Sequence, residues 1–115
     1  MFYKDLEVWK ESILLVEEIY VITQQFPKEE LYGISSQMRR AAVSIPSNIA
    51  EGSVRSSKKE TSHFIDISIG STAELDTQLI ISQRLGYNID TAIFDRIKKV
   101  NALLQGLKKY LTKLE

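Results

Sequence analysis

Residues 93–114 read IFDRIKKVNALLQGLKKYLTKL, and their apolar side chains recur at alternating steps of four and three residues. The members of this row are Ile93, Ile97, Val100, Leu104, Leu107, Leu111 and Leu114. Such spacing places every member on one side of an α-helix, as in the seam of a coiled coil. The segment therefore predicts a long amphipathic helix that packs on other helices. We expect it to begin near Asn88, because asparagine is a good N-cap residue.

The segment before Pro27 predicts another helix of the same kind. Its apolar row also follows steps of three and four and comprises Leu6, Trp9, Ile13, Val16, Tyr20 and Thr23. The helix is expected to end at Phe26, because the residue before a proline is pushed out of the α-helical region. The aromatic members Trp9 and Tyr20 are expected to pack in the core.

Residues 28–52 predict a further helix, with a proline inside it. Its row comprises Leu31, Ile34, Met38, Ala42, Ile45 and Ile49. Gly52 is expected to end the helix. Pro46 lacks a backbone N–H and crowds the carbonyl of Ala42, so we expect a kink there.

Residues 57–85 predict one more helix, which opens on a capping box. Ser57 and Glu60 stand three residues apart, so each side chain can satisfy a backbone N–H at the helix start. The expected core row comprises Phe64, Ile67, Ser71, Leu75 and Gln78. Residues 68–73 are mostly small, which favours either tight packing within the bundle or a second contact surface that promotes oligomerisation. Gly86 follows the expected end.

Four helical segments with short connections predict an all-α protein, namely an antiparallel up-and-down four-helix bundle with its second helix kinked at Pro46. The 115 residues are 43% apolar, which fits one domain spanning residues 1–115. The chain has no cysteine, which excludes disulfides, thiolate nucleophiles and cysteine-based metal sites. Its N-terminus lacks the apolar segment of a signal peptide, and no run approaches the roughly 20 apolar residues of a membrane helix. We expect a cytoplasmic protein without a membrane partner.

The net charge is zero, but the charges are segregated along the chain. Residues 1–38 carry 3 basic and 7 acidic side chains, and residues 60–95 carry 1 basic and 6 acidic side chains. Residues 39–59, in contrast, carry 5 basic and 1 acidic, and residues 96–113 carry 6 basic and none acidic. A net charge of zero therefore does not exclude a partner that bears phosphates.

Two interpretations of the basic segments remain open. Oppositely charged neighbouring helices can pair within the bundle, with each exposed pair contributing less than ~1 kcal/mol. Alternatively, the basic faces neutralise nucleic-acid phosphates and release counterions. The candidate phosphate contacts are Arg39, Arg40, Arg55, Lys58, Lys59, Lys98, Lys99, Lys108, Lys109 and Lys113. Arg39 and Arg40 are adjacent on one helix and therefore point about 100° apart. We expect one of them to bind within the bundle or to a neighbouring subunit and the other to face water.

Catalytic and metal-binding patterns are weak in this sequence. Glu60 and His63 have the spacing of one half of a di-iron carboxylate motif, but a site in a helical bundle needs a second such pair and two further glutamates. Glu60 is explained better as the capping-box partner of Ser57. No nucleophile motif or glycine-rich phosphate loop accompanies the single histidine. We therefore expect a protein that is not an enzyme and that holds no metal or cofactor.

The stretch from Ser36 to Gly52, SQMRRAAVSIPSNIAEG, resembles the signature of the 23S rRNA intervening-sequence protein family. The likeness continues through residues 57–60, SKKE, with weaker matches at residues 6–9, 26–30 and 70–79. The resemblance implies a four-helix bundle that assembles as a ring-like homopentamer. The family is also similar to the accessory protein of diversity-generating retroelements, a basic pentamer that binds nucleic acid and a reverse transcriptase. Some members are encoded inside insertions in large-subunit rRNA genes.

The matching motif also points to individual residues. It places Arg39, Arg40, Ser44, Pro46, Asn48 and Glu51 on the second helix. Asn48 and Glu51 are polar among apolar neighbours, so we expect them to form hydrogen bonds at a helix or subunit contact. Val54 stands where the family often has glycine, and Ser56 stands where it often has a basic residue. The basic cluster here is therefore weaker by about one charge.

Two hypotheses for the function follow. In the first, an oligomeric accessory protein binds RNA or DNA backbones without base specificity, and assembly repeats each basic patch so that avidity rises. In the second, a ring-shaped homo-oligomer is a scaffold that docks a protein partner and has no role with nucleic acid.

Overall fold

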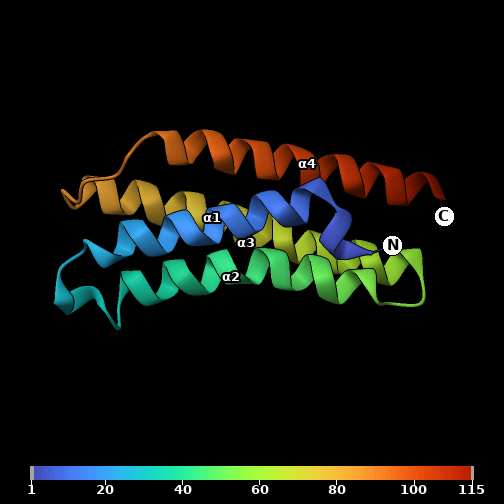
Figure 1. Ribbon diagram of the computed structural model, residues 1–115, viewed down its shortest axis with the longest axis horizontal. Coiled ribbons are helices and arrows are strands. Elements are labelled where there is room, and N and C mark those ends of the chain that lie inside the picture. The colour runs from blue at the N-terminus through green and yellow to red at the C-terminus, as the bar shows by residue number, and fades with distance from the viewer. Residues whose placement is uncertain (1, 115) are drawn as a thin grey trace.

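The structure is a computed structural model of the chain and describes residues 2–114. These residues form four α-helices and no β-strand, as Figure 1 shows: α1 (Glu7–Gln24), α2 (Ile34–Ser53), α3 (Lys58–Arg84) and α4 (Ala92–Leu114). Two short 3-10 helices, η1 (Tyr3–Asp5) and η2 (Lys28–Glu30), precede α1 and α2. The prediction of an all-α protein with four helices is confirmed.

The helices lie side by side along a long axis of 46 Å. Both α1 and α3 pack against α2 and α4, so that α1 and α3 face each other across the core. The α1–α2 and α3–α4 connections lie at one end of the molecule (Figure 1). The α2–α3 connection and both ends of the chain lie at the other. The start of α3 and the end of α4 therefore lie at the same end of the molecule.

The core follows the predicted rows of α2 and α4. Met38, Ala42, Ile45 and Ile49 of α2 are fully buried. On α4, five of the seven predicted positions are buried, whereas Leu107 is half-buried and Leu114 is exposed. The first predicted position of the α2 row, Leu31, precedes the helix and is exposed. In both helices the predicted apolar row coincides with the buried side, although further apolar side chains such as Leu103 of α4 and Val43 of α2 lie outside it.

The predicted core face of α1 was wrong. Apart from Thr23, which both rows share, the buried row lies one residue earlier than the predicted one and comprises Val8, Ser12, Leu15 and Ile19. Its polar members satisfy themselves locally, because Ser12 Oγ donates to the Trp9 carbonyl at 2.7 Å and Thr23 Oγ1 donates to that of Ile19 at 2.7 Å. The predicted row is rotated by about 100° from it. Trp9 is consequently only half-buried, and Tyr20 is 39% exposed.

The predicted core row of α3 was also wrong in its first half, where the buried face is rotated away from the predicted one. Ile67 is 38% exposed and Phe64 is half-buried, whereas Ile65 and Ser68 are fully buried. Ser68 Oγ donates to the Ile45 carbonyl of α2 at 2.9 Å, which lets a polar side chain face the core. Ser68 and Ser71 of the small-residue stretch thus contact α2, whereas Gly70 and Ala73 are exposed. Ser71, Leu75 and Gln78 are buried as predicted.

Several helix ends differ from the expected ones, since α1 ends at Gln24 and not at Phe26, and α2 begins at Ile34 and not near residue 28. The helix α4 begins at Ala92, four residues after Asn88, and the Asp90 carboxylate accepts the backbone N–H of Ala92 at 3.0 Å. The α3 end agrees with the prediction, because Leu85 caps it and Gly86 adopts a left-handed φ of 92°.

Gly52 does not end α2, which extends one residue further to Ser53. Glycine at this position instead allows α2 and α3 to approach each other closely. A Cβ at this position would lie 2.8 Å from the Cβ of Phe64 and 3.1 Å from the Thr61 carbonyl oxygen. Thr61 Oγ1 donates to the Gly52 carbonyl at 2.8 Å. The sequence therefore has glycine where α2 and α3 converge.

Pro46 is buried inside α2, and the helix is continuous from Ile34 to Ser53. Among residues 2–114, no helix is long and apolar enough to cross a membrane.

Candidate nucleic-acid interface

The α2–α3 corner gathers three of the predicted basic residues: Arg55, Lys58 and Lys59. Lys58 and Lys59 are the first two residues of α3 and are exposed. Positive side chains are unfavourable at a helix N-terminus, which already carries the positive end of the helix dipole. The corner therefore concentrates positive potential, and such a surface attracts anions.

The start of α3 is fixed by the predicted cap. Ser57 Oγ accepts the backbone N–H of Glu60 at 3.1 Å, which is the first half of the capping box. The Glu60 carboxylate lies 3.3 Å from the same hydroxyl instead of reaching the Ser57 backbone. Glu60 is thereby occupied at the cap, while His63 is exposed and its ring packs edge-on against Phe64. No group of three or more acidic or histidine side chains among residues 2–114 is placed to hold a metal ion.

Arg55 is engaged on both sides. Its guanidinium forms an ion pair with Glu51 and lies over the Phe64 ring, 4.8 Å from the ring centroid. Its positive charge is thus paired with Glu51, one turn earlier on α2. Of the three basic residues at the corner, Lys58 and Lys59 are the ones without an ion-pair partner within the described chain.

The basic residues of α4 fall into two classes. The first class pairs with acids of neighbouring helices. Lys99 Nζ lies 3.1 Å from Glu11 and 3.9 Å from Glu7, and Lys108 Nζ lies 2.7 Å from Asp66 of α3. Arg96 pairs with Glu11 and Glu18 of α1. These side chains hold helices together, as the intramolecular interpretation predicted.

The second class comprises Lys98, Lys109 and Lys113. All three are exposed, and none has an ion-pair partner within residues 2–114. Lys109 and Lys113 lie near the end of α4 that shares the α2–α3 end of the molecule, whereas Lys98 lies in the first half of α4. The structure therefore leaves only part of the predicted basic set exposed and without an ion-pair partner in the described chain.

The ion pairs of Glu11 have an electrostatic consequence. A hydrogen bond from Lys99 and the positive charges of Lys99 and Arg96 hold the pKa of the Glu11 carboxyl below its ordinary value of 4.5, against a partial burial that raises it. The carboxylate is thus stabilised in its charged form. This cluster ties α1 to α4.

Arg39 and Arg40 lie in different environments. Arg39 reaches α1, where its Nε donates to Thr23 Oγ1 at 2.9 Å and its guanidinium lies 4.6 Å from the centroid of the Tyr20 ring. Arg40 is exposed. The two residues stand on α2, away from the α2–α3 corner.

The motif residues of α2 form a polar contact between helices. Asn48 Nδ2 donates to the Ser44 carbonyl at 2.8 Å and to Ser44 Oγ at 2.9 Å. The Ser44 hydroxyl in turn shares a hydrogen bond with Ser71 of α3 at 2.8 Å. Glu51 does not join this network and pairs with Arg55. Within one chain, Asn48 and Ser44 therefore act at a helix contact.

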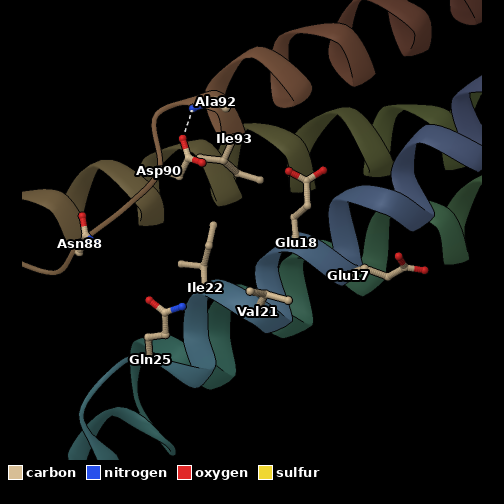
Figure 2. Close-up of a pocket in the computed structure, with 9 residues that line it drawn as sticks. All are labelled: Glu17, Glu18, Val21, Ile22, Gln25, Asn88, Asp90, Ala92 and Ile93. Atoms are coloured by element: carbon tan, nitrogen blue, oxygen red, sulfur yellow. Dashed lines mark hydrogen bonds between the residues drawn. The ribbon is translucent and has the colours of Figure 1, made fainter.

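One groove of the molecule is acidic. A cavity of about 540 Å³ lies between the end of α1 and the start of α4. Figure 2 shows Glu18 and Ile22 on α1 facing this start, where Asp90 binds the backbone of Ala92. Glu17, Glu18 and Asp90 line the groove and repel phosphates. This acidic face is therefore unfavourable for binding nucleic acid.

A comparison with protein-family models gives a match over residues 4–111 to the family described as 23S rRNA-intervening sequence protein. The chain belongs to this family. The family match includes the α2–α3 corner and every candidate basic residue except Lys113. A search of curated proteins found no match to the chain.

Sequence reasoning missed two features of this family member. The exposed Tyr32 lies beside Arg39 and Arg40, and no periodic pattern includes it. The row of Trp9, Ile13 and Val16 was assigned to the core although it lines an outer groove. That this row is only half-buried becomes visible only once the helices are packed together.

Proposed function

We propose that this chain is a non-enzymatic accessory protein that binds RNA or DNA backbones without base specificity. In this proposal the chain is a single domain, an antiparallel up-and-down bundle whose second helix is bent at Pro46. The observation that carries the proposal is the pair Lys58 and Lys59, which are unpaired and exposed at the positive end of α3. Lys109 and Lys113 add unpaired charge at the same end of the molecule. Phosphates would replace the counterions of these side chains.

The paired and unpaired lysines provide a matched test. The variant Lys58→Gln with Lys59→Gln removes two unpaired charges, and Lys99→Gln with Lys108→Gln removes two charges that already face acids. Both variants change the net charge by the same amount. We expect the first to weaken binding to a labelled duplex at low salt much more than the second. Equal losses would overturn the assignment to this corner, and absence of binding by the wild type at low salt would overturn the function.

We propose further that the protein self-associates through the outer face of α1 and α2, in a cytoplasmic homo-oligomer for which a pentamer is the expected size. A groove of about 310 Å³ is lined mainly by apolar side chains of the two helices, among them Trp9, Ile13, Val16 and Pro46. Half-buried apolar rows of this kind are commonly covered in an assembly. Assembly would repeat the basic corner in each subunit and raise avidity.

A positive charge introduced into this groove by one substitution tests the association. We expect Ile13→Lys to reduce the molar mass measured by light scattering to that of one chain, with helix content unchanged. An unchanged mass would overturn this interface. The same groove also favours a second candidate function, a scaffold that docks a different protein. Specific retrieval of that protein after nuclease treatment, together with no binding of nucleic acid, would support the scaffold instead.

A further inference from the structure

A third groove lies where α1 ends and α2 begins, away from the α2–α3 corner. It measures about 510 Å³ and is lined by Tyr20, Leu31, Tyr32, Ser36, Arg39, Arg40 and Val43. Tyr32 is 93% exposed, the largest exposed fraction among the large apolar and aromatic side chains of residues 2–114. A ring exposed to this degree contributes nothing to the core.

The turn that carries Tyr32 is held in place. The Gly33 N–H donates to the Glu30 carbonyl at 3.0 Å, and the Tyr87 hydroxyl donates to the Glu30 carboxylate at 2.6 Å. The Tyr87 ring also packs on Phe26, with 4.7 Å between ring centroids. These contacts tie the α1–α2 connection to the α3–α4 connection. Tyr32 is therefore an exposed ring on an anchored turn.

The two arginines give the groove an uncompensated positive charge. The Arg39 guanidinium lies over the Tyr20 ring and its Nε donates to Thr23 Oγ1, and neither Arg39 nor Arg40 has a carboxylate within 4.0 Å in the described part of the chain. An arginine held over an aromatic ring by these contacts keeps its positive charge. The groove thus combines aromatic surface with two free cations.

We propose that this groove binds an unpaired nucleobase of single-stranded nucleic acid, with the base stacked on Tyr32 and an adjoining phosphate on Arg40. Proteins that bind single strands use this combination of aromatic rings and positive charge. A duplex hides its bases within the stack and cannot offer one to Tyr32. This proposal rests on the proposed function. It adds that the protein prefers a single strand to a duplex, a preference that the lysines alone do not provide.

The experiment compares two probes of equal length and charge: a deoxythymidine oligonucleotide and an abasic oligonucleotide. Affinities are measured at one low salt concentration with the full chain. We expect the wild type to bind the deoxythymidine probe at least about fivefold more tightly, the low end of the contribution of one base–aromatic stack. Tyr32→Phe keeps the ring and should keep this preference. Tyr32→Leu keeps an apolar side chain but removes the ring, and it should lose the preference without losing affinity for the abasic probe.

A matched control is Tyr110→Leu, because Tyr110 is also exposed but lies on α4. It should retain the preference. Equal wild-type affinity for both probes would overturn the stacking site and leave the proposed function intact. Failure to bind either probe would overturn the proposed function itself. A change of molar mass in Tyr32→Leu would overturn the site too, since Tyr32 would then lie between copies of the chain.

Discussion

The convergence of α2 and α3 at Gly52 leads to a quantitative prediction for Gly52→Ala. The new Cβ would lie 2.8 Å from the Phe64 Cβ and 3.1 Å from the Thr61 carbonyl oxygen. Neither atom is the far end of a flexible side chain, so the two helices must move apart. Overpacking of this kind costs about 1–3 kcal/mol. The displacement would also strain the hydrogen bond from Thr61 to the Gly52 carbonyl.

Gly106→Ala isolates this cost. A Cβ at Gly106 of α4 would meet nothing within 4 Å. Both substitutions replace a helical glycine by alanine, which gains about 1 kcal/mol in a helix interior such as that around Gly106 and less at Gly52, one residue from the end of α2. The contact cost at Gly52 adds to this difference and is the larger contribution. We expect Gly52→Ala to be less stable than Gly106→Ala by about 1–3 kcal/mol, or by about 4–12 °C in Tm for a chain of this length.

Thermal unfolding followed by far-ultraviolet circular dichroism measures this difference. Gly70→Ala is a second control, because a Cβ there also meets nothing within 4 Å. Equal stability of Gly52→Ala and Gly106→Ala would refute the reasoning that α2 and α3 meet closely at Gly52. It would also remove the physical account of why the sequence has glycine at this position.

Further predictions concern the contacts between helices. Tyr87→Phe should lower Tm at neutral pH. Because the hydrogen bond to the Glu30 carboxylate, together with burial, raises the pKa of Tyr87 above 10.0, this difference should persist up to about pH 10 and disappear as the pH rises through the raised pKa. Equal Tm at pH 7 would contradict it. Glu11→Gln should lower Tm at pH 7, and the difference should vanish as the pH falls below 4.5 through the lowered pKa of Glu11, because the carboxylate then loses its charge. A difference that persists in acid would exclude the ion pairs as its cause. Asn48→Ala removes two hydrogen bonds and should destabilise by about 1–3 kcal/mol, whereas its exposed neighbour Ser47→Ala should change stability by less than about 0.5 kcal/mol. Equal stability of the two variants would contradict a structural role for Asn48.

The fold followed from the sequence where one apolar row dominated a helix. On α4 and α2 the rows of Ile97 and Ile45 faced the core as predicted. On α1 the spacing found a true apolar row, but the buried row contains Ser12, whose hydroxyl binds its own helix. Periodicity counts this hydroxyl as polar and therefore selects the neighbouring face, although Thr23 belongs to both rows.

The sequence predicted which basic residues belong to the candidate site, but not which of them are unpaired. The sequence gives the number of lysines on α4, but a carboxylate from another helix decides which of them are free. Lys108 meets Asp66 of α3, while its neighbour Lys109 has no such partner in the described chain. This pairing depends on how α3 and α4 pack, which local sequence does not encode. Tyr32 was missed because a single exposed ring in a turn leaves no periodic signal.

The salt dependence of nucleic-acid affinity tests the central claim most directly. The logarithm of the binding constant for a duplex probe, plotted against the logarithm of salt concentration, should fall linearly with a slope of about −0.9 for each phosphate neutralised. If Lys58, Lys59, Lys109 and Lys113 all engage phosphates, one subunit should give a slope near about −3.6, and Lys58→Gln with Lys59→Gln should reduce its magnitude by about 1.8. An affinity that is indifferent to salt, or a slope that the double substitution leaves unchanged, would contradict binding through this corner.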